Sequence, residues 1–186
     1  DGNTPTMLND LSAETSKYFM KAPPANILEF AISDRVILVE GPSEYMLFEK
    51  FYETVTNHKP ETDGVNIIDV RGLSFKRYLE LSKLIGEKTA VVTDNDHDYK
   101  RHCVDKYSDY AQTNNIKIFF SQDNKQNTFE VVLYNNNRNL CNELFGNAAL
   151  EYMLKNKTES AYQLLLSEKE IIVPEYTRRA IEWIKE

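Results

Sequence analysis

The chain has 186 residues, of which 41% are hydrophobic and 27% are charged, and its formal net charge is −7. This composition is that of an ordinary globular domain with or without an appendage, and it excludes a disordered chain. The acidic charge argues against a protein that grips nucleic acid by itself, because such proteins neutralise phosphates with lysine and arginine. That argument weakens if the carboxylates hold metal ions, or if a fragment has left its basic surface on another domain.

The sequence also limits where the protein can work. No apolar run is long enough to span a bilayer, and Asp1 opens a polar stretch that does not resemble a signal peptide, so no membrane partner is expected. Cys103 and Cys141 lie far apart, without CxxC or zinc-site spacing. We therefore expect a cytoplasmic protein with reduced thiols. Because the chain lacks an initiator methionine, we expect a fragment of a longer protein.

The first third of the chain contains one clear strand and one clear helix. Residues 1–34 are mixed: "LSAETSKYFM" is typical of a short helix, and the prolines of "APPAN" interrupt it. We interpret this segment as a lead-in from a preceding domain. "RVILVE", residues 35–40, is rich in β-branched residues and predicts a buried strand. "GPSE" then turns the chain into a helix with Ser43 as its expected N-cap.

The middle of the chain alternates strands and helices. "GVNIIDV", residues 64–70, predicts a second strand, and a helix with a glycine stop at Gly86 follows it. "TAVVTD" predicts a third strand, a polar helix is expected from about Asp98 to Gln112, and "IKIFF", residues 116–120, predicts a fourth strand. This alternation indicates right-handed βαβ units and a parallel sheet.

The last part of the chain is predicted to be mainly helical. "TFEVVLYN" fits either a strand or the start of a helix, and the asparagine run at 135–137 breaks it in both cases. "NLCNELFGNAALEYMLKN", "KTESAYQLLLSE" and "VPEYTRRAIEWIKE" then predict helices, with Pro174 near the first turn of the last one. The expected organisation is a lead-in over 1–34, an α/β core over 35–127 and a helical part over 128–186.

Acidic side chains follow two of the predicted strands. Glu40 ends the first strand, with Glu44 one helical turn further on, and Asp94 ends the third strand, with Asp96 two residues on. Because the carboxyl ends of parallel strands share one edge of a sheet, these carboxylates are expected to meet in one crevice. Such oxygen-rich sites suit Mg²⁺ or Mn²⁺, and two such ions can cleave phosphodiesters. The turn "EGPSE" adds a helix N-terminus, which favours a phosphate.

Each of these acidic motifs has a simpler interpretation. An aspartate after a strand is more often a turn former or a helix cap than a metal ligand. Asp98 is the clearest case, since it can cap the helix that follows it. Neither motif is specific alone, but both occur at the ends of predicted parallel strands, and this coincidence favours a metal site.

At these residues the sequence resembles a known family. "ILVEGPSE", "DVRGLSFKRYLELSKLIG" and "AVVTDNDHD" are similar to the Toprim domain, whose hallmark is a glutamate after the first strand and a DxD after a later one. Here these are Glu40 and Asp94-Asn95-Asp96. The likeness is closer to the OLD (overcoming lysogenization defect) nucleases, including Gabija-type anti-phage proteins, which join an N-terminal ATPase to a C-terminal Toprim. The lead-in, Glu44 and the C-terminal helices carry this closer likeness, which extends from about residue 8.

The resemblance implies a fold and an activity. The fold is an α/β, Rossmann-like Toprim with a central, mostly parallel four-stranded sheet flanked by helices, followed by a C-terminal helical appendage. The activity is cleavage or nicking of DNA by a metal-dependent endonuclease that uses two Mg²⁺ or Mn²⁺ ions. The partners are DNA, an ATPase domain of the same polypeptide and further copies of the full-length protein.

The resemblance also implies the residues of the site. Five carboxylates would hold the metals, namely those of Glu40, Glu44, Asp94, Asp96 and Glu130. The last of these lies in a Thr128-Phe129-Glu130 motif, and Lys157, four residues before Ala161, would stabilise charge on the phosphate. Glu40 and Asp94 would be catalytic together with Lys157.

Several site assignments keep alternatives. Lys155 competes with Lys157, and Glu130 and Lys157 can also be surface charges. Asp98, Gly72 and Thr128 are further candidates, although Gly72 can simply close a turn. A non-catalytic regulatory module that binds a nucleotide or a partner is the competing function. No Walker A motif is present, so an ATPase activity cannot reside in these residues.

Overall fold

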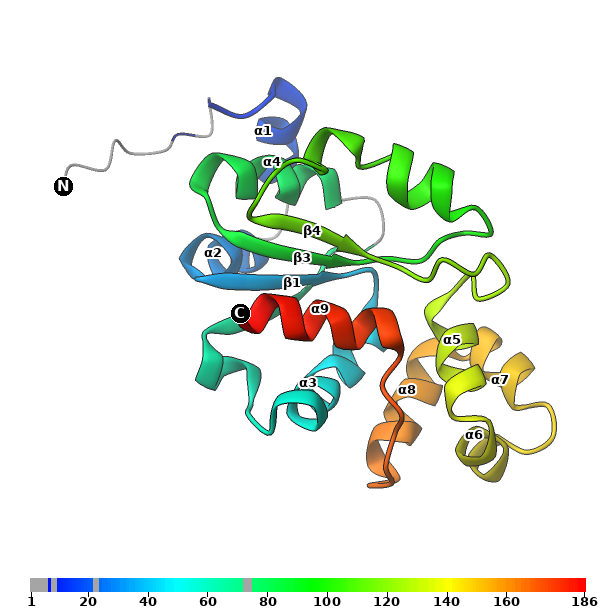
Figure 1. The fold of residues 1–186 in the computed structure, drawn as a ribbon. Coiled ribbons are helices and arrows are strands. Elements are labelled where there is room, and N and C mark those ends of the chain that lie inside the picture. The colour runs from blue at the N-terminus through cyan, green and yellow to red at the C-terminus, as the bar shows by residue number, and fades with distance from the viewer. Residues whose placement is uncertain (1–6, 8–9, 22–23, 72–74) are drawn as a thin grey trace.

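A parallel β-sheet forms the centre of the molecule (Figure 1). The computed structural model describes residues 7, 10–21, 24–71 and 75–186. Within them the strands are β1 (Arg35–Val39), β2 (Val65–Asp69), β3 (Lys88–Val92) and β4 (Ile116–Phe119). The strand order is β2-β1-β3-β4, and each neighbouring pair is parallel. The predicted α/β fold with a four-stranded parallel sheet is therefore confirmed.

The register of the sheet aligns the first and third strands along their length. Arg35 pairs with Lys88 and Leu38 with Val91, so β1 and β3 start and end together. Both strands consist mainly of β-branched and other apolar residues, and four of five positions in each are buried. This continuous burial is typical of a strand that is covered on both faces.

Helices cover both faces of the sheet and form two cores (Figure 1). On one face, Ile37 and Val39 pack against α3 (Pro42–Thr56) and α9 (Glu175–Lys185). On the other face, Val36 and Leu38 pack against α1 (Ala13–Phe19), α2 (Pro24–Ile32) and α4 (Phe75–Ile85). Alternate residues of β1 thus enter different cores, as the two-residue period of a strand requires.

The helix after β1 begins earlier than the sequence suggests. Gly41 is its N-cap and Pro42 its first residue, whereas Ser43 is buried inside the first turn. The expected Ser43 cap is therefore wrong. Proline is favoured at the first helical position because its fixed φ suits the helix and it has no N–H to leave unpaired.

The segment between β3 and β4 also differs from the prediction. In place of one helix from Asp98 to Gln112 there is a π-helix, η3 (Lys100–Asp105), and a short 3₁₀ helix, η4 (Ser108–Tyr110). A further 3₁₀ helix, η2 (Pro60–Asp63), precedes β2. The glycine stop after α4 is confirmed, since Gly86 has φ +80° and its N–H bonds to the carbonyl of Ser82.

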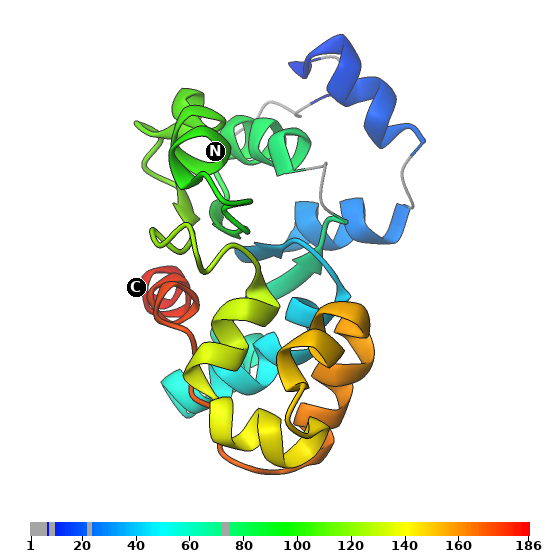
Figure 2. The same ribbon diagram turned by 90° about the vertical axis from the view of Figure 1, so that its right-hand side faces the viewer.

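The uncertain segment after β4 is helical. It contains α5 (Phe129–Asn136), α6 (Arg138–Phe145), α7 (Ala149–Lys155) and α8 (Lys157–Leu166). The asparagine run ends α5, as expected, and α6 starts at Arg138. These helices gather beyond the carboxyl ends of the strands (Figures 1 and 2). The chain then returns to the sheet through α9, so a single core joins residues of both halves.

Two general expectations can be compared with the structure. Cys103 and Cys141 are both buried free thiols, as the sequence leads us to expect. No helix in the described part of the chain is long and apolar enough to cross a membrane.

A buried carboxyl group lies at the amino ends of the strands, just before β3. Glu87 is 6% exposed, and among the described residues neither carboxyl oxygen has a hydrogen-bond partner. Burial, and then the nearby charge of Asp34, raises its pKa from 4.5 to about 8. The folded state therefore binds this proton more tightly than the unfolded state does. Glu87 thus makes the protein less stable as pH rises through the interval from about 4.5 to 8.

We expect Glu87→Gln to stabilise the protein at pH 8 and to have little effect at pH 4.5. The amide resembles the protonated acid and removes the cost of a buried charge, so the melting temperature at pH 8 should rise by about 2–4 °C for each kcal/mol gained. Thermal melts at both pH values measure this. Glu61→Gln, which changes an exposed carboxylate, is the control. An equal effect of Glu87→Gln at both pH values would contradict the prediction.

Candidate functional site

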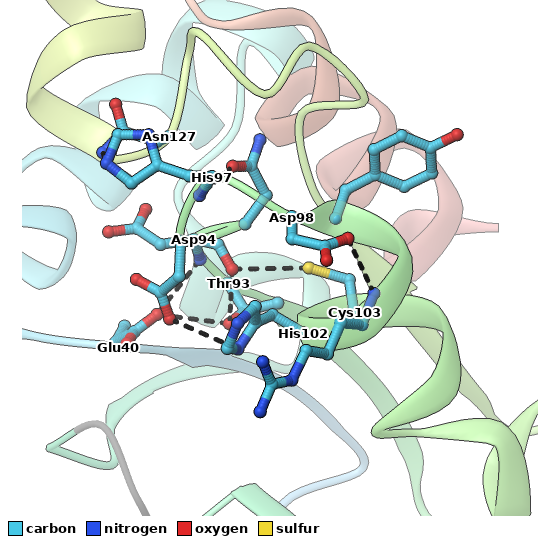
Figure 3. A network of polar contacts seen from close by, with 12 residues as sticks. Glu40, Thr93, Asp94, His97, Asp98, His102, Cys103 and Asn127 are labelled. Atoms are coloured by element: carbon cyan, nitrogen blue, oxygen red, sulfur yellow. Dashed lines mark hydrogen bonds and ion pairs between the residues drawn. The ribbon is translucent and has the colours of Figure 1, made fainter.

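Two carboxylates meet where β1 and β3 end. Glu40 follows β1, and its Oε2 accepts hydrogen bonds from the backbone N–H of Asp94 at 3.0 Å and from the Thr93 hydroxyl at 3.2 Å. Figure 3 shows the three residues together at the ends of the two strands. Because the strands are adjacent and in register, residues far apart in sequence share this edge.

Two further carboxylates come from the first turns of helices. Glu44 in α3 is 7% exposed and Glu130 in α5 is 3% exposed. Burial raises the pKa of Asp94 to about 9, and the charges of Glu40, Glu44 and Glu130 add to the rise. Burial likewise raises the pKa of Glu44 to about 8, with smaller increases from Glu130 and Glu40. The four carboxyl groups therefore share one poorly hydrated neighbourhood.

A single lysine joins this cluster. Lys157, the first residue of α8, places Nζ 2.9 Å from Oε2 of Glu130. Burial lowers the pKa of Lys157, but its hydrogen bond to Glu130 and the charge of Asp94 outweigh that effect and raise the pKa overall. Lys155 instead pairs with the exposed Glu151 on the surface of α7. Of the two lysines that the sequence left open, Lys157 is the one beside the carboxylates.

The other acids of the DxD loop lie differently. Asp96 is exposed, with Oδ2 3.9 Å from Nδ1 of His102. Burial raises the pKa of the Cys103 thiol to about 12, and the charges of Asp96, Glu40 and Asp94 add to the rise. Asp98 accepts a hydrogen bond from the N–H of Arg101 at 3.1 Å, in the first turn of η3, whose N-cap position is Tyr99 (Figure 3). This contact ties the Asp98 side chain to the start of η3.

Two residues, Thr128 and Gly41, shape the turns that carry site carboxylates. Thr128 is the N-cap of α5, because its hydroxyl accepts from the N–H of Val131, and it thereby orients the turn that holds Glu130. A Cβ at Gly41 would lie 3.4 Å from Oε2 of Glu44, so glycine lets the turn after β1 pass close to that carboxylate. Gly72 lies outside the described residues.

One residue of the site was not predicted from the sequence. Tyr176, in the first turn of α9, is buried, and its pKa is raised well above 10 by burial and then by the charges of Asp94 and Glu44. The phenol is therefore close enough to these carboxylates for their charges to act on it. No local motif marks it, because it reaches the site only when α9 packs against the sheet.

Tyr176 also lines a cavity of about 410 Å³. Its walls include Ser121 and Gln122 after β4, Asn136 at the end of α5, and Arg179 of α9. Arg179 is exposed and forms no ion pair with any other described residue. The walls thus carry one cation, Arg179, and one carboxylate, Glu175, among the described residues, and Tyr176 is the residue that the cavity shares with the candidate site.

The donor set of the cluster fits a divalent ion by its chemistry. Carboxylate oxygens are the ligands that Mg²⁺ and Mn²⁺ prefer, and a cation would relieve the repulsion and the poor hydration that raise the pKa values of Glu44 and Asp94. Among the described residues, however, no three Asp, Glu, His or Cys side chains lie close enough to hold an ion as they stand. The spacing of these side chains is therefore wider than a closed coordination sphere.

We expect Asp94→Asn to raise the melting temperature in the presence of EDTA as the pH approaches 9, because the buried Asp94 carboxyl then loses its proton among like charges and the amide cannot. Mn²⁺ should stabilise the wild-type protein by binding the folded state, and it should stabilise this variant less. Thermal melts with EDTA and with Mn²⁺ measure both effects. Asp109→Asn, an exposed control on η4, should behave as wild type. A wild-type melting temperature that does not respond to Mn²⁺ would count against a metal site.

Known proteins resemble the chain in sequence and in structure. Residues 32–96 match the family model described as the overcoming lysogenization defect protein-like TOPRIM domain. No curated protein matches the chain. The predicted resemblance to an OLD-type Toprim is confirmed by this match and by the solved structures that share the fold.

Two solved structures illustrate the shared fold. One is the C-terminal region of the Burkholderia pseudomallei OLD protein, with a TM-score of 0.64 and 16% identity over 83% of this chain and 98% of that one. The other is the C-terminal region of the Xanthomonas campestris pv. campestris OLD protein, with a TM-score of 0.58 and 20% identity over 84% of this chain and 94% of that one. The similarity therefore includes the helical part as well as the sheet.

Proposed function

Starting from an OLD-like Toprim domain in residues 32–96, we propose that the chain is a divalent-metal-dependent endonuclease module that cleaves or nicks DNA. The observation that carries this proposal is the convergence of Glu40 and Asp94 at the ends of β1 and β3. Glu44, Glu130 and Lys157 complete the cluster. Buried carboxylates of strongly perturbed pKa beside a lysine, in the crevice of a parallel sheet, are typical of a catalytic site.

Each residue has a proposed role. Glu40, Glu44, Asp94 and Glu130 hold the metals, and the exposed carboxylate of Asp96 is the fifth proposed ligand. Two Mg²⁺ or Mn²⁺ ions, when bound, supply an activated water and stabilise the leaving oxygen. Lys157, oriented by its hydrogen bond to Glu130, stabilises the negative charge that develops on the phosphate. Tyr176 closes one wall of the site and excludes water from it.

The cavity beside Tyr176 is the proposed path of the DNA backbone. Arg179 is positioned to contact a phosphate there, and the amides of Gln122 and Asn136 can donate to phosphate or sugar oxygens. Because the whole chain carries a net charge of −7, a few cations near the site cannot give a high affinity for DNA. The remaining affinity is proposed to come from an N-terminal ATPase domain of the same polypeptide and from further copies of the full-length protein.

The proposed domain organisation follows from the same resemblance. Residues 1–34 are the proposed lead-in from the ATPase, 35–127 the Toprim core and 128–186 the helical part that completes the site. The contributions of Glu130, Lys157 and Tyr176 support the last of these roles, since all three come from the helical part. The proposed setting is cytoplasmic defence against phage.

We expect Glu40→Ala and Asp94→Ala to reduce Mg²⁺- or Mn²⁺-dependent nicking of plasmid DNA by at least about a hundredfold, because each removes a metal ligand. Supercoiled plasmid incubated with each metal, and with EDTA, provides the measurement, and circular dichroism verifies the fold. Asp109→Ala is the matched control, since it removes a carboxylate from the surface. Full activity of Glu40→Ala or Asp94→Ala would refute the proposal. Wild-type metal binding without cleavage under any metal would favour the regulatory module instead.

The two lysines offer a second matched test. We expect Lys157→Met to lower the nicking rate by about a hundredfold or more, because it removes the cation beside the carboxylates. Lys155→Met should leave the rate unchanged, because Lys155 pairs with Glu151 at the surface. Rates measured at saturating Mn²⁺ and DNA separate this effect from binding. Equal rates for the two variants would remove Lys157 from the mechanism.

A further inference from the structure

The middle residue of the DxD motif is a buried amide with every polar group in use. Asn95 is 0% exposed, although it lies between two aspartates in a loop. Its Nδ2 reaches three backbone carbonyl oxygens of the loop that follows β4, at 2.8 Å for Ser121, 3.0 Å for Asp123 and 3.2 Å for Gln126. One side chain thus ties the DxD loop to residues 121–126.

The acceptor of the same amide shapes the DxD loop itself. Oδ1 of Asn95 accepts a hydrogen bond from the N–H of His97 at 3.0 Å. Asp96 and His97 have φ angles of +46° and +68°. Residues other than glycine adopt this left-handed region only at a cost in free energy. The bond from Asn95 therefore helps to hold an unfavourable turn, and the direction of the Asp96 side chain depends on that turn.

A second set of contacts fastens the same two loops. The N–H of Asp96 donates to the carbonyl of Asn127 at 3.2 Å, and Nδ2 of Asn127 lies 3.1 Å from Nε2 of His97 (Figure 3). The next residue after Asn127 is Thr128, the N-cap of the helix that carries Glu130. These contacts and the hydrogen bonds of Asn95 together connect the backbone at Asp94 with the backbone that leads to Glu130.

We propose that Asn95 is a positioning residue that sets the separation of the Asp94 and Glu130 carboxylates and the turn at Asp96, and so controls affinity for the divalent ions. This inference rests on the proposed function, because it needs a metal at those carboxylates. Asn95 contacts neither carboxylate directly and acts through the two loops that it joins. Outer groups that orient metal ligands typically change metal affinity about 10- to 100-fold when they are removed.

The chemistry of the site requires an amide at this position. Alanine would remove the side-chain donor that the carbonyl oxygens of Ser121, Asp123 and Gln126 share, and the Asp123 oxygen would keep only the N–H of Gln126. Aspartate has the same shape, but it would place a carboxylate oxygen against those carbonyls and repel them. Both substitutions are therefore expected to let the two loops separate.

The experiment measures the Mn²⁺ concentration at half-maximal nicking in the full-length protein. For Asn95→Ala this midpoint should rise about 10- to 100-fold while the KM for DNA stays near the wild-type value. Calorimetry with Mn²⁺ alone should show the same loss of affinity without DNA. A purely structural role would lower the amount of active protein but would leave the midpoint unchanged.

Asn137→Ala is the matched control. Asn137 is also a buried amide that bridges two segments, since it donates to the carbonyls of Leu133 and Ile172 and accepts from the N–H of Ile172. Its loss should destabilise the protein comparably without changing the Mn²⁺ midpoint. Equal shifts for Asn95→Ala and Asn137→Ala would overturn the inference, as would an unshifted midpoint for folded Asn95→Ala.

Three further outcomes are distinguishable. If Asn95→Ala does not fold, Asn127→Ala tests the same connection, because it removes only the side-chain contact with His97. Its midpoint should rise by a smaller factor, and an unchanged midpoint would overturn the inference. If the wild-type protein neither binds Mn²⁺ nor nicks DNA, the proposed function itself fails. A wild-type protein that does both, with unchanged variants, refutes the role of Asn95 alone.

Discussion

The hydrogen bond from the backbone N–H of Asp94 to Glu40 is the contact around which the site is built. It joins the ends of two neighbouring strands and uses an oxygen of Glu40 as an acceptor, so that one carboxylate is oriented by the backbone of the other. Two like charges can be held close together only if the surrounding structure fixes them there. The in-register pairing of β1 with β3 provides that fixation.

The helices add the remaining groups and remove water. Glu44 and Glu130 come from the first turns of two helices, Lys157 begins a third, and Tyr176 belongs to the first turn of α9. Each helix start thus delivers one polar side chain to the same place. The consequence is a cluster whose pKa values are raised mainly by burial, and which a cation would stabilise.

Much of the sheet and part of the site could be predicted from the sequence, because both depend on local patterns. Runs of β-branched residues indicated the strands, and their alternation with helices indicated the parallel order. The placement of Glu40 and Asp94 followed from these two facts. The family resemblance supplied Glu130 and Lys157, which no local pattern identifies as part of the site.

Other features could not be predicted, because they depend on contacts between distant segments. "TFEVVLYN" has the composition of a strand, but Thr128 caps a helix there and the apolar residues pack under the helical part. Asp96 is exposed in a turn of positive φ, and the buried Asn95 side chain stabilises this turn by accepting a hydrogen bond from the N–H of His97. Tyr176 reaches the carboxylates only through the packing of α9, and neither its own position nor its neighbours in the sequence indicate this.

The late position of α9 in the sequence has a consequence for synthesis. A ribosome releases the four strands well before residues 175–185, so the sheet face that carries Ile37, Val39 and Val92 lacks the part of its cover that α9 provides until the end of synthesis. The nascent chain therefore exposes part of its apolar core until residues 175–185 leave the ribosome, and the last helix to be made is also the one that brings Tyr176 to the site.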